Sequence, residues 1–411
     1  MYKTATVKRK RIVVDAPPLS PVETLGEVST SVSGRITVSV HHNLAEIEQL
    51  WREFEHSGIC SVYQRFDWVD RWMSSAGKAQ KASPYIIIGR VGGKPMFLYP
   101  FALFCRGPFC IVNWIGGSHS NFNLGIYDPD FIKNVRLNDM RAIFRHVVKY
   151  AEGVDAFELC CQPMSWQGHN NPLNFLKRLA SPNHAFSMQL APTFDEVLAE
   201  HNAKKKRKKY RSQMRAMEAL GGPKLIRAET ENDITQLLDS AFEQIKIRLD
   251  RMRVINVFEE EGIRTLFLEL AISSIGEAEP SLVIYGLEVD GKIRATFAGG
   301  GHQGRFSGCF TSIAMDELAS TSPGDLLLYL VIEDCVKRGY SSFDLGRGEE
   351  RYKSSWCNEV VPMFESFIPV SKRAIALTVY DHIKVTVKRV IKQNPKLWQF
   401  TKQMRARLRK S

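Results

Sequence analysis

Hydrophobic and polar positions follow two different periods along the chain, and both begin at about residue 36. Apolar residues at every second position predict strands, whereas apolar residues at helical spacing predict amphipathic helices. In the first part, the pattern predicts strands at 36–40, 85–88, 96–101, 110–115 and 157–161, and helices at 44–54, 62–73 and 139–150. The strand pair around Gly92-Gly93 is expected to be a hairpin.

The same order of elements returns after residue 220. Asp290-Gly291 marks a second hairpin, since this dipeptide suits a tight turn between strands. Here the pattern predicts strands at 225–228, 282–289, 293–298, 305–313 and 342–345, and helices at 233–249, 258–273 and 323–338. Because the order recurs, we expect an internal duplication and an α/β fold with mixed sheets.

The chain is expected to divide into four parts. Residues 1–35 mix proline, serine, threonine and glycine without periodicity, which predicts a disordered lead. The two halves of the duplication are expected at 36–190 and 191–370, and a basic amphipathic tail at 371–411. The tail has apolar residues at nearly helical spacing: Ile375, Val379, Ile383, Val387 and Ile391. Such a helix can lie on an anionic membrane surface or pack against the body or a partner, and both options stay open.

The net charge of +12 is unevenly distributed. Residues 204–215 carry a net +8 and residues 372–411 a net +11, so the remainder is acidic at −7. The six consecutive cations from Lys204 to Lys209 could contact phosphates or steer an anionic ligand, or they could be one solvated helix face. Nucleic acid is therefore not an expected partner of the body.

The eight cysteines form no C-x-x-C pair, and no Cys/His spacing fits a zinc site. We therefore expect free thiols, no metal and a reducing compartment. The sequence shows no signal-peptide core and no uncharged apolar run of about 18 residues. A soluble, cytoplasmic protein is expected, with peripheral attachment at the inner face of the membrane as an option.

Three motifs in the second half occur in a recognisable series: Ser322-Pro323-Gly324, then Phe343-Asp344-Leu345-Gly346, then Gly348-Glu349 with Tyr352-Lys353. As a set they resemble the CelD-type branch of the GNAT superfamily, acetyltransferases linked to cellulose and exopolysaccharide biosynthesis. The plan of two halves is similar to that of the FemABX peptidoglycan-bridge transferases. The resemblance implies two tandem GNAT-like acyltransferase halves. It also implies transfer of an acyl group, expected to be acetyl, from acyl-CoA to an amine or hydroxyl, conceivably on a sugar precursor.

The resemblance places the co-substrate acetyl-CoA at the start of the helix predicted at 323–338. Ser322 is a good N-cap, Pro323 suits the first helical position, and Gly324 would let a ligand approach the backbone. With Asp325, these residues form the expected pyrophosphate site, because a helix N-terminus attracts anions. The strand residues Phe310, Thr311 and Ser312 are expected to bind the pantetheine arm through their backbone.

The candidate catalytic residues follow the strand at 342–345. Glu349 could deprotonate the acceptor, Tyr352 could protonate the departing thiolate, and Lys353 could stabilise the oxyanion or hold an acidic substrate. A solvated Glu–Lys surface pair is the competing interpretation. Asp316 is a further candidate base, or simply caps a loop.

The first half contributes a polar loop after the strand at 110–115. Its candidate substrate-binding residues are His119, Asn121 and Asn123, although an ordinary turn would also explain them.

Two other functions remain open at this stage. An aminoacyl-tRNA-dependent transferase of the FemABX kind is favoured by the two halves and the basic helix. A degenerate GNAT scaffold at the membrane surface is favoured by Ala319-Ser320-Thr321, which stands where a GNAT loop normally binds CoA.

Overall fold

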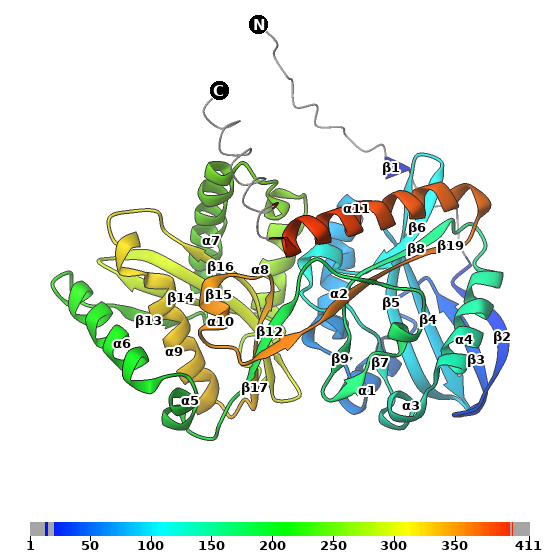
Figure 1. The fold of residues 1–411 in the computed structure, drawn as a ribbon, viewed down its shortest axis with the longest axis horizontal. Coiled ribbons are helices and arrows are strands. Elements are labelled where there is room, and N and C mark those ends of the chain that lie inside the picture. The colour runs from blue at the N-terminus through cyan, green and yellow to red at the C-terminus, as the bar shows by residue number, and fades with distance from the viewer. Residues whose placement is uncertain (1–12, 15–19, 395–396, 398–411) are drawn as a thin grey trace, which may run out of the picture.

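Two mixed sheets lie side by side in the computed structural model, each covered by helices (Figure 1). The structure describes residues 13–14, 20–394 and 397. The predicted α/β fold class, with two tandem GNAT-like halves, is confirmed.

The first sheet has the spatial order β11-β19-β8-β6-β5-β4-β3-β2, with β1 and β7 added at β5. Its strands are β1 (Val13–Val14), β2 (Val22–Thr30), β3 (Gly34–His41), β4 (Ser83–Val91), β5 (Lys94–Arg106), β6 (Phe109–Trp114), β7 (Ile126–Tyr127), β8 (Ala156–Pro163), β11 (Leu179–Ala180) and β19 (Met363–Pro369). The helices of this half are α1 (Glu48–Ser57), α2 (Phe66–Trp72), α3 (Pro129–Asn134) and α4 (Leu137–Tyr150). A small separate ribbon contains β9 (Ser165–Trp166) and β10 (His169–Asn170).

The second sheet has the spatial order β13-β14-β15-β16-β17-β12-β18. Its strands are β12 (Ala185–Gln189), β13 (Lys224–Arg227), β14 (Val283–Val289), β15 (Lys292–His302), β16 (Arg305–Ile313), β17 (Ser342–Arg347) and β18 (Glu359–Val361). The helices of this half are α5 (Phe194–Glu200), α6 (Ala203–Glu218), α7 (Glu231–Met252), α8 (Ile263–Ser273), α9 (Pro323–Lys337) and α10 (Arg351–Ser354), and α11 (Ile375–Gln393) follows.

The two sheets share one strand order, which confirms the predicted duplication. In each sheet, one strand pairs with a hairpin, and two parallel strands follow the hairpin. The order is β3-β4-β5-β6-β8 in the first sheet and β13-β14-β15-β16-β17 in the second. The parallel pairs are β6 with β8 and β16 with β17. A helix connects the strands of each parallel pair, as parallel neighbours require.

Each half also receives a strand from the other. β19 comes from the segment 191–370 yet pairs with β8 of the first sheet, and Figure 1 shows it running alongside that strand. Conversely, β12 comes from the segment 36–190 yet pairs with β17 and β18 of the second sheet. The boundaries predicted at 190 and 370 therefore divide the chain differently from the sheets, because pairing between distant strands leaves no local signal.

The prediction that residues 1–35 are disordered is wrong for the residues that form β2. β2 pairs with β3 along its whole length, and Leu25 and Val28 are buried beneath α4. β2 is the edge strand of the sheet, so its outward positions are polar and its apolar pattern is weak. Residues 1–12 and 15–19 of the lead lie outside the described residues.

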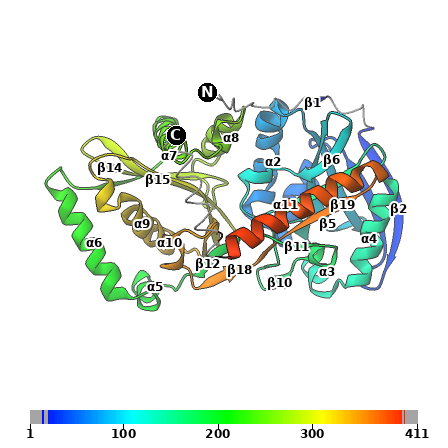
Figure 2. The same ribbon diagram turned by 45° about the horizontal axis from the view of Figure 1, so that its top comes forward.

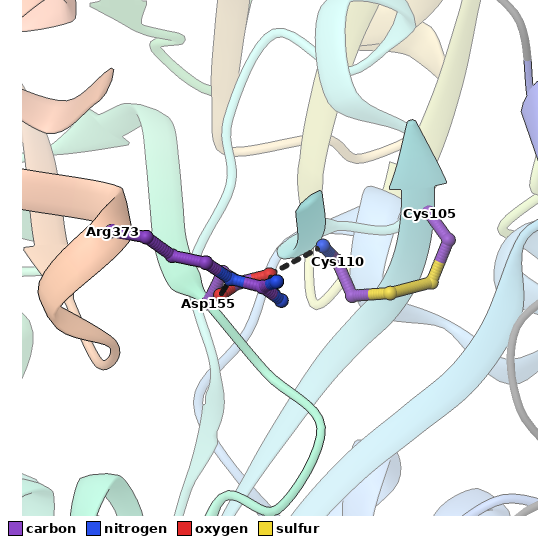
Figure 3. Close-up of a disulfide and its surroundings, with 4 residues drawn as sticks. All are labelled: Cys105, Cys110, Asp155 and Arg373. Atoms are coloured by element: carbon purple, nitrogen blue, oxygen red, sulfur yellow. Dashed lines mark hydrogen bonds and ion pairs between the residues drawn. A yellow bond between two sulfur atoms is a disulfide. The ribbon is translucent and has the colours of Figure 1, made fainter. Parts of the chain in front are cut away.

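A disulfide joins Cys105 and Cys110, contrary to the expectation of free thiols (Figure 3). The two residues are direct cross-strand partners in the β5–β6 hairpin, which brings their side chains together. The remaining six cysteines are free.

Asp155 lies beside this hairpin and holds the beginning of the C-terminal segment (Figure 3). Its carboxylate accepts hydrogen bonds from the Cys110 amide at 2.9 Å and from Arg373 at 2.6 and 2.7 Å. Burial tends to raise the pKa of Asp155, but the hydrogen bonds from Arg373 and Ser371 hold it below its ordinary value. The chain is thus anchored immediately before α11.

α11 lies along the outside of the first sheet in both ribbon views (Figures 1 and 2). It packs on β19 and β11, and its His382 ring lies 5.4 Å from that of Phe367. Within the described residues, no helix is long and apolar enough to cross a bilayer. Residues 395–396 and 398–411 of the predicted tail lie outside the described residues.

An acidic pair at the α11–β8 contact predicts a pH-dependent stability. Burial, then repulsion from Asp381, raises the pKa of Glu158 to about 7, while Arg106 and Lys384 oppose that rise. A carboxyl with a raised pKa binds more protons in the folded state, so stability falls as the pH rises from about 4.5 to 7. We expect Glu158→Gln to raise the melting temperature by a few °C at pH 8 and to change it little at pH 5, measured by scanning calorimetry. An equal shift at both pH values would contradict this account.

Candidate active site

The two parallel strands of the second half diverge after a short paired stretch. β16 and β17 pair only at Arg305–Ser342, Phe306–Phe343 and Ser307–Asp344. Beyond this point β16 continues along β15 and β17 continues along β12. The edge of β16 from Gly308 onward therefore has no strand partner on this side, and a wedge-shaped opening forms.

Asp344 of β17 binds β16 at the closed end of this opening. Its carboxylate is fully buried and accepts hydrogen bonds from Arg305 Nη1 at 2.9 Å and Ser307 Oγ at 3.0 Å. Burial raises the pKa of Asp344, while Arg305 and Ser307 act in the opposite direction. The aspartate of the Phe-Asp-Leu-Gly motif thus connects β17 to β16 and does not face a ligand site.

A cavity of about 170 Å³ occupies the open end of the wedge. Both halves of the chain contribute to its wall, the second half through α7, β15, β16, β17 and α10. The lining residues include Asn121, Arg248, Phe258, Gly308, Cys309, Phe310, Thr311, Arg347, Glu350, Tyr352 and Lys353. With three cations and one carboxylate in this set, the cavity is basic.

Lys353 and Glu350 form an ion pair on one wall. Lys353 is only 4% exposed, and its Nζ lies 2.9 Å from Glu350 and donates to the Arg347 carbonyl at 2.6 Å. Burial lowers the pKa of Lys353, and Glu350 opposes that shift. Glu350 immediately precedes the short helix α10, and Lys353 is the third residue of that helix, so the start of α10 brings the two side chains together.

Asn121 reaches the cavity from the first half. Its Nδ2 donates to the Gly308 carbonyl at 2.8 Å, and the Tyr63 hydroxyl donates to the same carbonyl at 3.2 Å. Gly346 leaves the room that Asn121 needs, since a Cβ there would lie 2.4 Å from Asn121 Nδ2, and its φ of +67° also favours glycine. The site therefore depends on contact between the two halves.

A second cavity, of about 770 Å³, lies between α6, α9 and α10. Lys205, Lys206 and Lys209 of α6 line it, together with Tyr210, Asp325 and Trp356. Lys206 Nζ stands 3.5 Å from the centre of the Trp356 ring, and burial lowers the pKa of this lysine to about 8. Tyr352 lines both cavities, so it lies between the small cavity at the wedge and the larger, lysine-lined one.

The predicted helix start differs from expectation in detail. Pro323 is the first residue of α9, as predicted, but Ser322 has φ +60° and its side chain makes no capping hydrogen bond. Gly324 packs against Ile313, since a Cβ there would lie 2.7 Å from that side chain. Asp325 pairs with Lys209. Gln213 of α6 donates to the Thr321 and Ser322 carbonyls, so α6 covers this end of α9.

Other predicted residues lie apart from the cavity. Glu349 and Glu350 are both exposed, but only Glu350 is among the residues that line the cavity. Asp316 is paired with Arg294 at 2.7 Å. Ser312 is buried against Thr296 and Gln244, on the side of β16 away from the opening.

The three predicted substrate-binding residues of the first half also separate. Asn121 lines the small cavity. His119 instead contacts the Val257 carbonyl at 3.2 Å, and Asn123 donates to the Gly117 and Cys160 carbonyls. Of the predicted catalytic and backbone residues, Tyr352, Lys353, Phe310 and Thr311 come together at the cavity.

Sequence reasoning missed Glu350, Arg347 and Arg248. Glu350 could have been found from its spacing of three residues to Lys353. Arg347 spans the two halves, donating to the Ser118 and Ser120 carbonyls and to Cys161 Sγ, and no local pattern indicates such a contact.

Comparison with known proteins agrees with this geometry. Residues 204–354 match the family model of the acetyltransferase (GNAT) domain, and this range includes β16, β17 and most of the lining residues. The second half is therefore similar in sequence to GNAT acetyltransferase domains over this range. No curated protein matches the chain.

Solved structures share the fold over most of the chain at low identity. FemX is 10% identical with a TM-score of 0.56, covering 80% of this chain and 98% of FemX. The C-terminal domain of a putative lysylphosphatidylglycerol synthetase from Agrobacterium fabrum is 12% identical with a TM-score of 0.49, covering 83% of this chain and 97% of that one. A tandem GNAT protein from the clavulanic acid biosynthesis pathway is 12% identical with a TM-score of 0.44, covering 85% and 99%.

Proposed function

We propose that the protein transfers an acyl group, acetyl in the simplest case, from acyl-CoA to an amine or hydroxyl acceptor. The observation that supports this most directly is the wedge between β16 and β17, whose cavity meets a second, lysine-lined cavity at Tyr352. A donor with a small acyl group at one end and phosphates at the other matches this pair of cavities in size and charge. The match to a GNAT acetyltransferase domain supports the same chemistry.

The phosphates of the donor are assigned to the larger cavity. Three lysines of α6 line it, and cations within hydrogen-bonding reach stabilise phosphate oxygens. This placement differs from the expectation at Ser322 and Gly324, because α6 covers the start of α9 and Ile313 occupies the space beside Gly324.

The reaction is assigned to the small cavity. The acceptor attacks the thioester carbonyl, Glu350 takes the proton from the acceptor, and Lys353 stabilises the oxyanion. When the carbon–sulfur bond breaks, the thiolate takes a proton from Tyr352, whose position between the cavities suits this role. Glu350 then releases its proton to solvent, and Tyr352 takes one up from solvent, so both side chains return to their starting state.

Matched lysine variants test the donor. Lys205→Gln with Lys209→Gln removes two cavity lysines, whereas Lys204→Gln with Lys208→Gln removes the same charge from the same helix outside the cavity lining. We expect the first pair to weaken acetyl-CoA binding by about tenfold or more and the second to change it by less than about threefold, measured by isothermal titration calorimetry. Equal effects of the two pairs would argue against phosphates in this cavity.

An aminoacyl-tRNA donor is the second candidate, and a specific observation favours it. α6 presents Lys204, Arg207, Lys208 and Arg211 to solvent in addition to the cavity lysines, which makes a basic surface longer than CoA needs. In titrations with charged tRNA, this candidate predicts that both lysine pairs weaken binding. A chain that binds neither donor would instead be a degenerate scaffold.

The setting in cellulose or exopolysaccharide biosynthesis remains a proposal that rests on the motif series alone. Testing sugar amines and sugar hydroxyls as acceptors, with release of free CoA as the readout, would examine it.

A further inference from the structure

Many apolar side chains of α11 are exposed on the side of the helix away from the sheet. Six of them are about half exposed or more: Ile375 (51%), Val379 (51%), Tyr380 (62%), Ile383 (57%), Val387 (50%) and Val390 (48%). Their spacing of three or four residues puts them on one side of the helix. We call these six residues the α11 apolar face.

The opposite side of α11 makes the contacts with the body. Thr378 is buried there, His382 packs against Phe367, and Asp381 lies beside Glu158. Leu377 and Val385 are also half-buried on this side, so both polar and apolar residues contact the body. The six residues of the α11 apolar face are nevertheless left exposed, whereas an ordinary surface helix turns its apolar stripe to the core. A contiguous exposed apolar surface of this kind typically marks an interaction site.

The charges beside the α11 apolar face are of one sign. Lys384 and Lys388 are exposed along the helix, and Lys372 precedes it. Arg373 also precedes it, but its charge is paired with Asp155. The one acid of α11, Asp381, is directed to the sheet and is only 15% exposed. The α11 apolar face next to exposed cations fits a partner that has an anionic surface above an apolar interior.

We propose that α11 docks the protein on an anionic lipid bilayer, with its apolar face inserted at the level of the headgroups. The helix lies on the membrane and does not cross it, in line with the finding that no described helix is long and apolar enough to span a bilayer. A second copy of the chain fits less well, because pairing two such faces would bring like-charged lysines together. The chain's own segment 398–411 is also basic, so it lacks charge complementarity to this face.

Co-sedimentation of the full chain with vesicles tests this docking. We expect binding to vesicles of phosphatidylcholine and phosphatidylglycerol at 3:1, at least about tenfold weaker binding to pure phosphatidylcholine, and a marked loss at 1 M salt, where charges are screened within about 3 Å. Equal binding to both vesicles, or none to either, would overturn the proposal.

A matched pair of variants assigns the effect to α11. Val379→Asp with Ile383→Asp places two charges on the α11 apolar face, and Val254→Asp with Ile255→Asp places two on another exposed apolar site, after α7. We expect the first to weaken vesicle binding by about tenfold or more and the second to leave it within about twofold, since only α11 should insert. Circular dichroism establishes that both variants are folded.

Two results would overturn the assignment. If both double variants lose binding equally, the lipid contact is not at α11. If Val379→Asp with Ile383→Asp changes the molecular mass in sedimentation velocity without vesicles, a second copy covers this face.

Discussion

Replacing Glu350 by glutamine is expected to lower turnover by about 10²–10⁴-fold while donor binding is retained, because a general base typically contributes this much. Glutamine keeps the shape of the side chain but cannot accept the acceptor's proton. The measurement is release of free CoA under saturating acetyl-CoA, with donor affinity from calorimetry. Glu350 was selected by its contact with Lys353 and its place in the cavity wall.

The adjacent Glu349 provides the matched control. It has the same chemistry, lies one residue away and is exposed like Glu350, but it lies outside the cavity lining. Glu349→Gln should therefore change turnover by no more than about twofold. If Glu349→Gln abolishes turnover and Glu350→Gln does not, the segment before α10 is arranged differently in the active enzyme and the sequence-based assignment is right.

Replacing Asp344 by alanine is expected to destabilise the folded chain by about 3–5 kcal/mol, since removing one partner of a buried ion pair leaves the other charge unpaired. Arg305 would lose its carboxylate, and Ser307 would lose its acceptor. β16 and β17 would then lose the contact that fastens the closed end of the wedge. Urea unfolding followed by fluorescence measures the loss.

Two further variants distinguish the loss of the ion pair from a nonspecific loss of stability. Ser307→Ala removes a single hydrogen bond and should cost only about 1 kcal/mol. Arg305→Ala combined with Asp344→Ala should cost less than the sum of the single changes, because the two residues interact directly. Strict additivity would mean that the pair contributes little and that Asp344 acts by packing.

Local patterns predicted most helices, both hairpins and the duplication, because periodicity and turn residues are properties of short segments. The exchange of β12 and β19 could not be predicted, because both strands pair with partners far away in the sequence. β2 was missed because an edge strand needs apolar residues on one side only.

The site was predicted at the level of segments but not of individual side chains. The series of glycines and charged residues indicated the loop after β17, and Tyr352 and Lys353 of this region line the cavity. The choice between Glu349 and Glu350 depends on the backbone conformation of the segment just before α10. The sequence indicated an accessible helix start at Ser322, but it cannot show that α6 covers the start of α9.

The exchange of β12 and β19 also limits how this duplicated chain can be divided. A fragment ending near residue 190 would lack β19 and carry β12 without its partner, and the complementary fragment would have the opposite defect. Each would present unpaired strand edges, which favour aggregation. Exchanging one half alone for that of a relative would therefore also have to preserve the pairing of the strand that each half lends to the other.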